Sequence, residues 1–417
     1  MLGVLIDLAP LRVRAFRRLW IGRTISGLGG QMALVAVMFQ VWQSTGSTVW
    51  TGAVGLAQAV PLIAFGLFAG SLVDRVDRRR FYLLTTTGQA VCAVLLAVQG
   101  FLGSPPAVVL VMVAAQSCFV AGGGPAARTF VSALLPREQL AAGLALNRIA
   151  FQGAMLAGPA AGGLVVGWVG VGGCYLIDAA TFAVALYGAF RLPELRPSGA
   201  PARPGLHGVL DGLAFMARNP VVRGALLTDL AATVLSMPIS LFPLINAERF
   251  GNDPRTLGLF LSAIAVGGVV ASFFSGAFTS GTRPGLVMLA GSALWGVSLA
   301  LFGLSSNPWA GLGFLVVAGA ADTVAVVSRG TLVQLHTPDS LLGRVSAAEQ
   351  IVGQAGPDLG NLRGGLVAGL SSGGFALVSG GVLCVAAVAA VGMGVRGFAR
   401  PSPFPKPPRS ARSPWPR

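Results

Sequence analysis

The side chains of this sequence that could carry chemistry are charged groups set inside long apolar segments. They are Arg23, Arg148, Asp178, Asp229, Asp322, Glu349, Asp358 and Arg363. A charge near the centre of a bilayer costs roughly 2.5–3.5 kcal/mol, so such a group faces a cavity or a partner. A carboxyl group there can take up and release a proton as its surroundings change between dry and wet. We rank Asp229 first, then Glu349 and Asp322, as candidates for proton coupling; a structural ion pair is the alternative interpretation for each.

Other kinds of chemistry have little support in the sequence. The four cysteines have no C-x-x-C spacing and only two histidines are present, so we expect no metal site and no nucleophile triad. A single lysine, Lys406, leaves no phosphate-binding G-x-x-x-x-G-K-[ST] motif. The sequence therefore predicts no cofactor and no enzymatic activity. Uncharged polar groups that could line a binding cavity are Gln31, Gln40, Gln116 and Asn246.

The segments that hold these groups are too apolar for a water-soluble protein. Charged residues make up 10% of the 417 and hydrophobic residues 54%, with a mean hydropathy of +0.75, whereas soluble domains are about 25% charged. This excludes an ordinary soluble enzyme and a disordered chain. A membrane-crossing helix needs about 20 apolar residues. Twelve such spans are predicted, at 17–43, 48–73, 81–102, 106–128, 140–167, 171–190, 220–247, 256–279, 284–304, 308–328, 341–369 and 372–395.

The basic residues predict the orientation of these spans. If both termini are cytoplasmic, 24 of the 29 lie on the cytoplasmic side, and only Arg249 and Arg255 lie in outer loops. Cytoplasmic loops of membrane proteins are enriched in arginine and lysine. The sequence therefore predicts a multi-pass protein of the cell membrane with both ends inside. The net charge of +15 then faces the membrane surface, and we expect no binding of nucleic acid.

The chain divides into two halves around its longest inner connection. We expect a six-helix bundle over 1–190, a linker over 191–219, a second bundle over 220–395 and a disordered Pro/Arg-rich tail over 396–417. The linker contains Leu206, Val209, Leu210, Leu213 and Ala217, whose spacing predicts an amphipathic surface helix. The sequence Gly-Gly-Leu-Val recurs at 162–165 and 364–367, which indicates a duplicated unit, an architecture typical of transporters.

The loop between the second and third spans, Gly70-Ser-Leu-Val-Asp-Arg-Val-Asp-Arg-Arg-Arg80, resembles the G-x-L-x-D-R-x-G-R-[KR] loop of the major facilitator superfamily. The resemblance implies an all-α membrane fold of twelve helices in two pseudo-symmetric bundles. It also implies that Asp74, Arg75 and Arg78 close an inner gate, with Arg128 as a partner. Asp77 stands where the pattern has glycine, so the tight turn of the family is not expected there.

Two further stretches resemble particular branches of that superfamily. Gly158, Pro159, Gly162 and Gly163 match the G-P-x-x-G-G element of drug–proton antiporters. Another stretch begins at Gln334 and continues through Thr337, Pro338, Gly343 and Arg344. It is similar to the branch that contains the enterobactin exporter and the macrolide efflux proteins.

These resemblances imply a monomeric transporter that exports a small amphipathic molecule in exchange for protons. A siderophore is the first expectation for the molecule exported. Multidrug or macrolide efflux is the second. A proton-coupled nutrient importer and a membrane protein that transports nothing remain as alternatives.

Overall fold

The computed structural model describes residues 7–73, 76–192, 205–274 and 283–395, and these parts of the chain contain helices and no strand. The α-helices are α1 (Arg14–Thr45), α2 (Thr48–Val73), α3 (Arg78–Leu102), α4 (Pro106–Leu134), α5 (Leu140–Phe190), α6 (Gly205–Arg218), α7 (Pro220–Ser236), α8 (Phe242–Arg249), α9 (Pro254–Phe273), α11 (Pro284–Leu304), α12 (Pro308–His336), α13 (Asp339–Leu370) and α14 (Gly373–Gly394). Short 3₁₀ helices are η2 (Ala9–Arg12), η3 (Arg137–Gln139) and η4 (Ile239–Leu241).

Ten helical segments in the described parts of the chain are long and apolar enough to cross a membrane. One of them, 137–190, contains two of the predicted spans, which Gly170 separates by a non-helical φ of 74°. The predicted span over 341–369 lies within α13. The all-α membrane architecture with twelve crossings is therefore confirmed.

The helices end where the local sequence provides a cap or a break. Gly46 and Gly103 take left-handed backbone conformations at the ends of α1 and α3, which glycine adopts without steric cost. Side chains of Asn219 and Asn307 accept hydrogen bonds from the first backbone N–H groups of α7 and α12. The predicted span over 220–247 is broken at Met237–Pro238 into α7, η4 and α8, because proline has no N–H for helical pairing.

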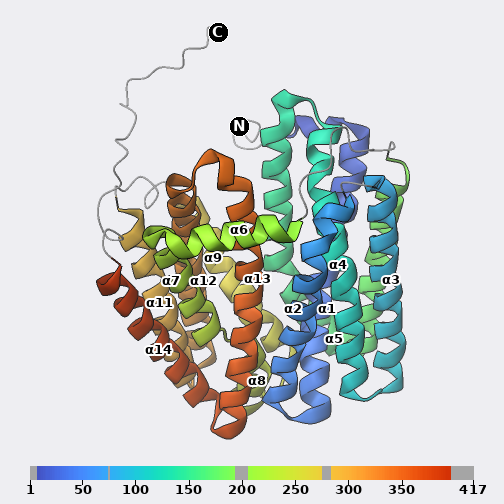
Figure 1. Cartoon of the computed structure of the whole chain (residues 1–417). Helices are drawn as coiled ribbons and strands as arrows, with labels where there is room; N and C mark the ends of the chain where they lie inside the picture. The colour runs from blue at the N-terminus through green and yellow to red at the C-terminus, as the bar shows by residue number, and fades with distance from the viewer. Residues whose placement is uncertain (1–6, 74–75, 193–204, 275–282, 396–417) are drawn as a thin grey trace.

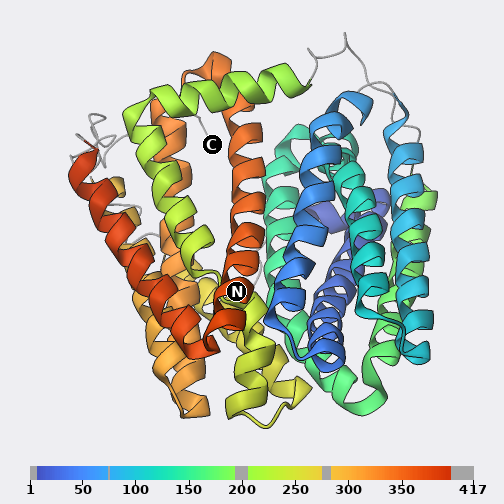
Figure 2. The same ribbon diagram turned by 60° about the horizontal axis from the view of Figure 1, so that its bottom comes forward.

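The helices form two bundles that lie side by side (Figures 1 and 2). The first half contains α1–α5 and the second contains α7–α14; the halves meet through α5 with α9 and through α2 with α13. Helix α6 lies across one end of the second half (Figure 2) and contacts α2. We call this the α6 end, and the opposite end, where α1 turns into α2, the Gly46 end.

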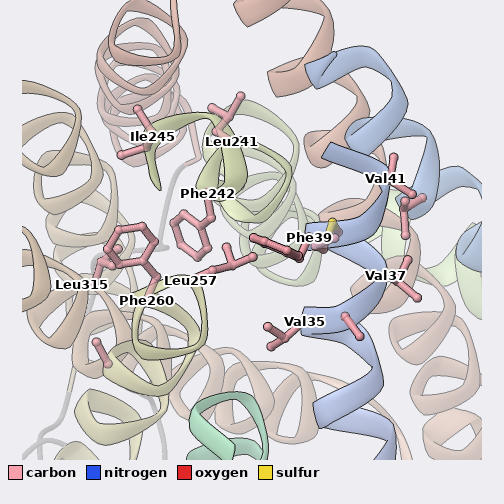
Figure 3. Close-up of a cluster of buried hydrophobic side chains, with 14 of the residues drawn as sticks. Val35, Val37, Phe39, Val41, Leu241, Phe242, Ile245, Leu257, Phe260 and Leu315 are labelled. Atoms are coloured by element: carbon pink, nitrogen blue, oxygen red, sulfur yellow. The ribbon is translucent and has the colours of Figure 1, made fainter. Parts of the chain in front are cut away.

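At the Gly46 end the two halves share one hydrophobic core. Figure 3 shows Phe39 of α1 pointing toward Phe242 of α8 and Leu257 of α9, whereas Val37 and Val41 lie on the opposite side of α1. The rings of Phe242 and Phe260 lie 5.4 Å apart, a distance that suits favourable aromatic packing. Polar contacts add to this core: the Thr48 hydroxyl donates to the Gly365 carbonyl at 2.7 Å. The Thr51 hydroxyl donates to the Ser240 carbonyl at 2.8 Å.

The predicted amphipathic helix of the linker is present as α6, but its buried face differs from the predicted stripe. Met216 is fully buried against Val222, Val333 and Val345, whereas Leu210 is 52% exposed. Leu213 packs at the edge of this cluster. The buried face is shifted around the helix because α13 packs directly against the backbone of Gly212.

Candidate functional site

A cavity of about 260 Å³ lies between the two halves. The first half contributes Gln31 and Leu34 from α1 and Met155 and Pro159 from α5. The second half contributes most of the lining, which is largely apolar. Its members are Asp229, Ala232, Thr233, Met237, Ile239, Leu261, Ile264, Ala265, Trp295, Asp322, Val326, Arg329, Gly353 and Pro357. Pro159 and Pro357 line the cavity from helices at equivalent positions in the two halves.

Arg329 of α12 holds two carboxylates that come from two other helices. Its Nη1 is paired with Oδ1 of Asp229 on α7, and its Nε donates to Oε1 of Glu349 on α13 at 3.0 Å. The three side chains are only 10–19% exposed. A guanidinium group suits this task because it stays charged and presents several donors in a fixed plane. One cation therefore ties α7, α12 and α13 together beside the cavity.

Asp322 lies on the same face of α12 as Arg329 and adds a third carboxyl group to those of Asp229 and Glu349. Asp322, Val326 and Arg329 stand at i, i+4 and i+7 and all line the cavity, as helical periodicity requires. Asp322 lies within electrostatic range of Asp229 and Arg329. With every group ionised, three carboxylates face one guanidinium. Excess negative charge in an apolar cavity is relieved by a proton or a cationic group, so this arrangement can exchange protons.

Two residues of the cavity lining, Trp295 and Thr233, make hydrogen bonds to α7. The indole Nε1 of Trp295 donates to the Ser236 hydroxyl at 2.9 Å, which joins α11 to α7 where α7 ends. The Thr233 hydroxyl donates to the Asp229 carbonyl within α7. These bonds fix the backbone on which Asp229 is presented.

The structure brings together the three candidates for proton coupling, Asp229, Glu349 and Asp322, and it places Gln31 in the cavity lining. The other polar candidates lie elsewhere. Gln40 is buried inside the first bundle, where it exchanges amide hydrogen bonds with Gln99 at 2.9 and 3.0 Å. Asn246 is fully buried on α8 and donates to the Asp253 carbonyl. Gln116 lies on α4, outside the cavity lining.

The remaining charged groups of the predicted spans are scattered. Arg23 donates to the Ala127 carbonyl at 3.3 Å, and Arg363 donates to the Leu235 carbonyl. Asp178 is fully buried in the first half. Its carboxylate oxygens have no hydrogen-bond partner among the residues that the structure describes. Asp358 lies on α13, where its backbone packs on Gly55 of α2.

The residues expected at the inner gate can be placed only in part. Asp74 and Arg75 lie outside the described residues, as does the side chain of Arg128 on α4. Arg78 is the first residue of α3. Asp77 stands where the family pattern has glycine, and the structure gives it a role there. Its carboxylate caps α3 by accepting from the N–H groups of Arg79 and Arg80 at 2.8 and 3.0 Å.

The glycines of the G-P-x-x-G-G element lie where other helices touch α5. A methyl group at Gly162 would lie 2.8 Å from Cα of Met32 on α1, and one at Gly163 would lie 2.5 Å from the Pro254 carbonyl oxygen. A methyl group at Gly158 would lie 2.4 Å from Cβ of Gln31. Small residues at these positions permit close helix contact within and between the halves.

The stretch around Gln334, Pro338, Gly343 and Arg344 joins α12 to α13 at the α6 end. Arg344 donates to Asp211 of α6 at 2.9 Å, and both side chains are exposed, at 39% and 58%. Gln334 and Pro338 are exposed. This stretch therefore holds the linker helix on the second bundle rather than lining the cavity.

Arg329 is the site residue that sequence reasoning missed. The predicted tenth span ends at 328 and leaves Arg329 outside the membrane, whereas α12 continues to His336. The seven-residue separation from Asp322 was the signal that could have revealed it. Trp295 was missed as well, since a tryptophan inside an apolar span carries no distinguishing pattern.

Comparisons with known proteins agree with this architecture. A family model described as transmembrane secretion effector matches residues 6–399. The enterobactin exporter EntS of Shigella flexneri is 28% identical over 389 residues, covering 91% of this chain and 93% of EntS. EntS of Escherichia coli O1:K1 / APEC has the same identity and coverage.

Solved structures share the fold at low sequence identity. The nucleoside transporter NupG has a TM-score of 0.69 at 15% identity, covering 92% of this chain and 98% of NupG. A bacterial homologue of the iron transporter ferroportin, in an inward-facing state, has a TM-score of 0.67 at 15% identity. That alignment covers 93% of this chain and 99% of the homologue. With two helical bundles and a family-model match over residues 6–399, the chain belongs to the transmembrane secretion effector family of the major facilitator superfamily.

Proposed function

We propose that this protein exports a small amphipathic molecule, a siderophore of the enterobactin type as the first candidate, in exchange for protons. The observation that carries the proposal is the Arg329 side chain, shared between Asp229 and Glu349 beside an apolar cavity. The enterobactin exporter EntS, 28% identical over nearly the whole chain, supports the direction of transport and the class of cargo.

The α6 end is the cytoplasmic end in this proposal. Arginines cluster in the segments that meet there, whereas Arg249 and Arg255 stand at the Gly46 end. The retention of basic residues on the cytoplasmic side supports this orientation. The Gly46 end then faces outward, with both termini inside the cell.

Transport proceeds by alternating access of the cavity to the two sides of the membrane. The shared core and the Thr48–Gly365 and Thr51–Ser240 hydrogen bonds keep the outer side closed. Outward opening must break these contacts as the bundles rock, while a gate at the inner side closes. We assign that gate to Asp74, Arg75, Arg78 and Arg128 on the strength of the loop's resemblance to the superfamily.

Protons are coupled to this motion through Arg329. Protonation of Asp229 removes the charge that holds Arg329 on α7, so the guanidinium is freed toward Glu349 and Asp322. Because the carboxylates lie on α7, α12 and α13, loading or releasing a proton changes which helices are tied together. Asp229 is the first candidate for the proton carrier, followed by Glu349 and Asp322.

Export of several unrelated amphipathic drugs, macrolides included, is the second candidate function. The lining is largely apolar and includes Leu34, Met155, Ile239 and Leu261. It therefore favours hydrophobic molecules in general and does not select for one particular polar group. In either case we assign the activity to a single copy of the chain.

The proposal is tested in everted membrane vesicles that carry the protein. With the vesicle interior acid, enterobactin should accumulate inside, and a protonophore should abolish the accumulation. The Asp229→Asn variant should lose the dependence on the pH gradient. Asp211→Asn is the matched control, because Asp211 is also paired with an arginine but lies on α6, away from the cavity.

Three outcomes would contradict the proposal. Accumulation under an inside-alkaline gradient would indicate import, and accumulation without any gradient would exclude antiport. Uptake of macrolides but not of enterobactin would favour the second candidate. In cells, deletion of the protein should lower extracellular siderophore and raise intracellular siderophore during growth without iron.

A further inference from the structure

Helices α5 and α9, which form one of the two largest contacts between the halves, touch closely at one level and border a recess nearer the α6 end. The tight contact lies at Gly258, where a methyl group would lie 2.3 Å from the Pro159 carbonyl oxygen. A second one lies at Gly163 beside Pro254. Toward the α6 end, Arg148 and Val269 stand eleven residues from Pro159 and Gly258 along their helices, which corresponds to about 16 Å of helix.

This recess, of about 670 Å³, lies between α5 and α9. Arg148, Gln152 and Gly153 of α5, Val269 and Phe273 of α9 and Val327 of α12 form its walls. Phe273 is 84% exposed, and Ile149 and Phe151 are also exposed. The recess therefore opens on an exposed, largely apolar part of the membrane-spanning helices α5 and α9.

The recess continues inward to the central cavity. A smaller space of about 160 Å³ shares Arg148, Gln152 and Val327 with it. The smaller space also shares Met155, Asp322 and Val326 with the central cavity. Three neighbouring spaces with shared lining residues therefore extend from the recess between α5 and α9 to Asp322.

The mouth of this passage has an uneven distribution of charge. Arg148 is the charged group of the mouth among the described lining residues, and its guanidinium lies 5.8 Å from the ring of Phe151. Apolar side chains make up most of the remaining wall. A cation set in an apolar wall at the membrane flank complements a molecule with a greasy body and a negatively charged head.

We propose that the gap between α5 and α9 is a lateral portal through which cargo enters the cavity from the bilayer leaflet, as an amphiphile with an anionic head. Arg148 receives the head, and Gln152 and Met155 border the path to Asp322. This inference rests on the proposed export function for the identity of the cargo, but the portal itself can be tested without transport.

Gly153 provides a way to close the portal. It lines the recess, and a Cβ atom added there meets no atom within 4 Å, so the side chain of Gly153→Trp starts from open space. Gly313→Trp is the matched control. Gly313 is also an exposed helical glycine with open space around it, but it lies on α12 outside the portal.

The probe is a fatty acid that carries a photoreactive diazirine, which partitions into the bilayer and has one carboxylate. Purified protein in phosphatidylcholine nanodiscs is irradiated with this probe, and labelled peptides are mapped by mass spectrometry. We expect label on 148–156 of α5, 264–273 of α9 and 319–327 of α12. Gly153→Trp should reduce that label at least tenfold, and Gly313→Trp should leave it unchanged.

Arg148→Gln should lower labelling by the fatty acid severalfold without changing labelling by the matching fatty alcohol, which has no charge. Equal labelling of Gly153→Trp and wild type, or label confined to other lipid-facing helices, would overturn the portal. Suppression of the label by phosphatidylglycerol in the nanodisc would overturn the assignment to cargo and indicate a lipid site.

A transport measurement then separates this inference from the proposed function. Enterobactin accumulation in everted vesicles should fall at least tenfold in Gly153→Trp and persist in Gly313→Trp. Portal labelling in a wild-type protein that exports no enterobactin would refute the proposed cargo and still support the portal. Full export by Gly153→Trp would refute the portal and leave the export function standing.

Discussion

The two halves of the molecule bury polar side chains in different ways. In the first half, Gln40 and Gln99 exchange amide hydrogen bonds, and the Tyr175 hydroxyl donates to Gln40 at 2.9 Å. In the second half, Arg329 is held between Asp229 and Glu349. The first network is neutral and fully buried within one bundle, whereas the second is ionic and borders the cavity between the bundles.

This difference separates a fixed support from a switch. Neutral amides and a phenol keep their charge state across the physiological pH range, so the first network holds α1, α3 and α5 in one arrangement. Carboxylates that share one guanidinium can change partners when a proton arrives, because the pairing depends on their charge. The halves share a fold, but we expect only the second to respond to protons.

Among these changes, removal of Arg329 should cause the largest loss of stability. Arg329→Met leaves two carboxylates without their cation, and loss of one member of a buried ion pair costs roughly 3–5 kcal/mol. Thermal unfolding in detergent should show a strong loss of stability that diminishes as pH is lowered, because protonation neutralises the carboxylates. A triple variant that adds Asp229→Asn and Glu349→Gln should recover much of the loss. Equal stability of Arg329→Met and wild type would show that the ionic network does not hold the bundle.

Loss of a single carboxylate should have an intermediate effect. Glu349→Gln removes the negative charge beside the Arg329 Nε but leaves an amide oxygen and Asp229 in place, so the loss should lie below the roughly 1.5–3 kcal/mol that a hydrogen bond to a charged group contributes. The pH profile of transport in everted vesicles should shift as well. A pH profile identical to that of wild type would exclude Glu349 from proton coupling and leave Asp229 and Asp322.

Disruption of the neutral network should lower stability without changing coupling. Gln40→Leu leaves Gln99 and Tyr175 with unsatisfied buried groups, at a cost of about 1–3 kcal/mol. Gln40→Leu combined with Gln99→Leu should be less destabilised than the sum of the single changes. The dependence of transport on the pH gradient should match wild type; a lost dependence would end the distinction between support and switch.

The smallest effect is expected at the ionic pair outside the cavity. Arg344 and Asp211 are exposed, and exposed ion pairs contribute about 0.2–1 kcal/mol. Arg344→Gln should therefore change thermal stability little and leave the pH profile intact. A profile as altered as that of Glu349→Gln would show that charge in the second half matters irrespective of its place.

The fold was predictable because hydropathy and basic residues report directly on the bilayer. The spans follow from apolar length, and Gly46 and Gly103 mark turns by their conformational freedom. Helix ends were less predictable, because a helix continues through polar residues as long as its backbone is paired. Thus α12 runs past 328 and brings Arg329 inside.

The site was predictable only in part, because a span that is apolar on all sides does not reveal which face meets the cavity. Asp229, Glu349 and Asp322 stood out as charges, and charge in a bilayer needs a partner. Gln40 and Gln31 are alike in the sequence and lie on the same helix, yet one is sealed in the first bundle and the other faces the cavity. Their difference depends on Gln99 and Tyr175, which lie far away in the chain.

The helix α5 has a practical consequence for probes of this molecule. Its two membrane crossings join at Gly170 with almost no loop between them. Insertion of an epitope tag there would disrupt the helix on both sides, and the connection exposes too few residues for an antibody to bind. The irregular turns at 103–105 and 305–307 are the better places for tags, fluorophores or binders on that side of the membrane.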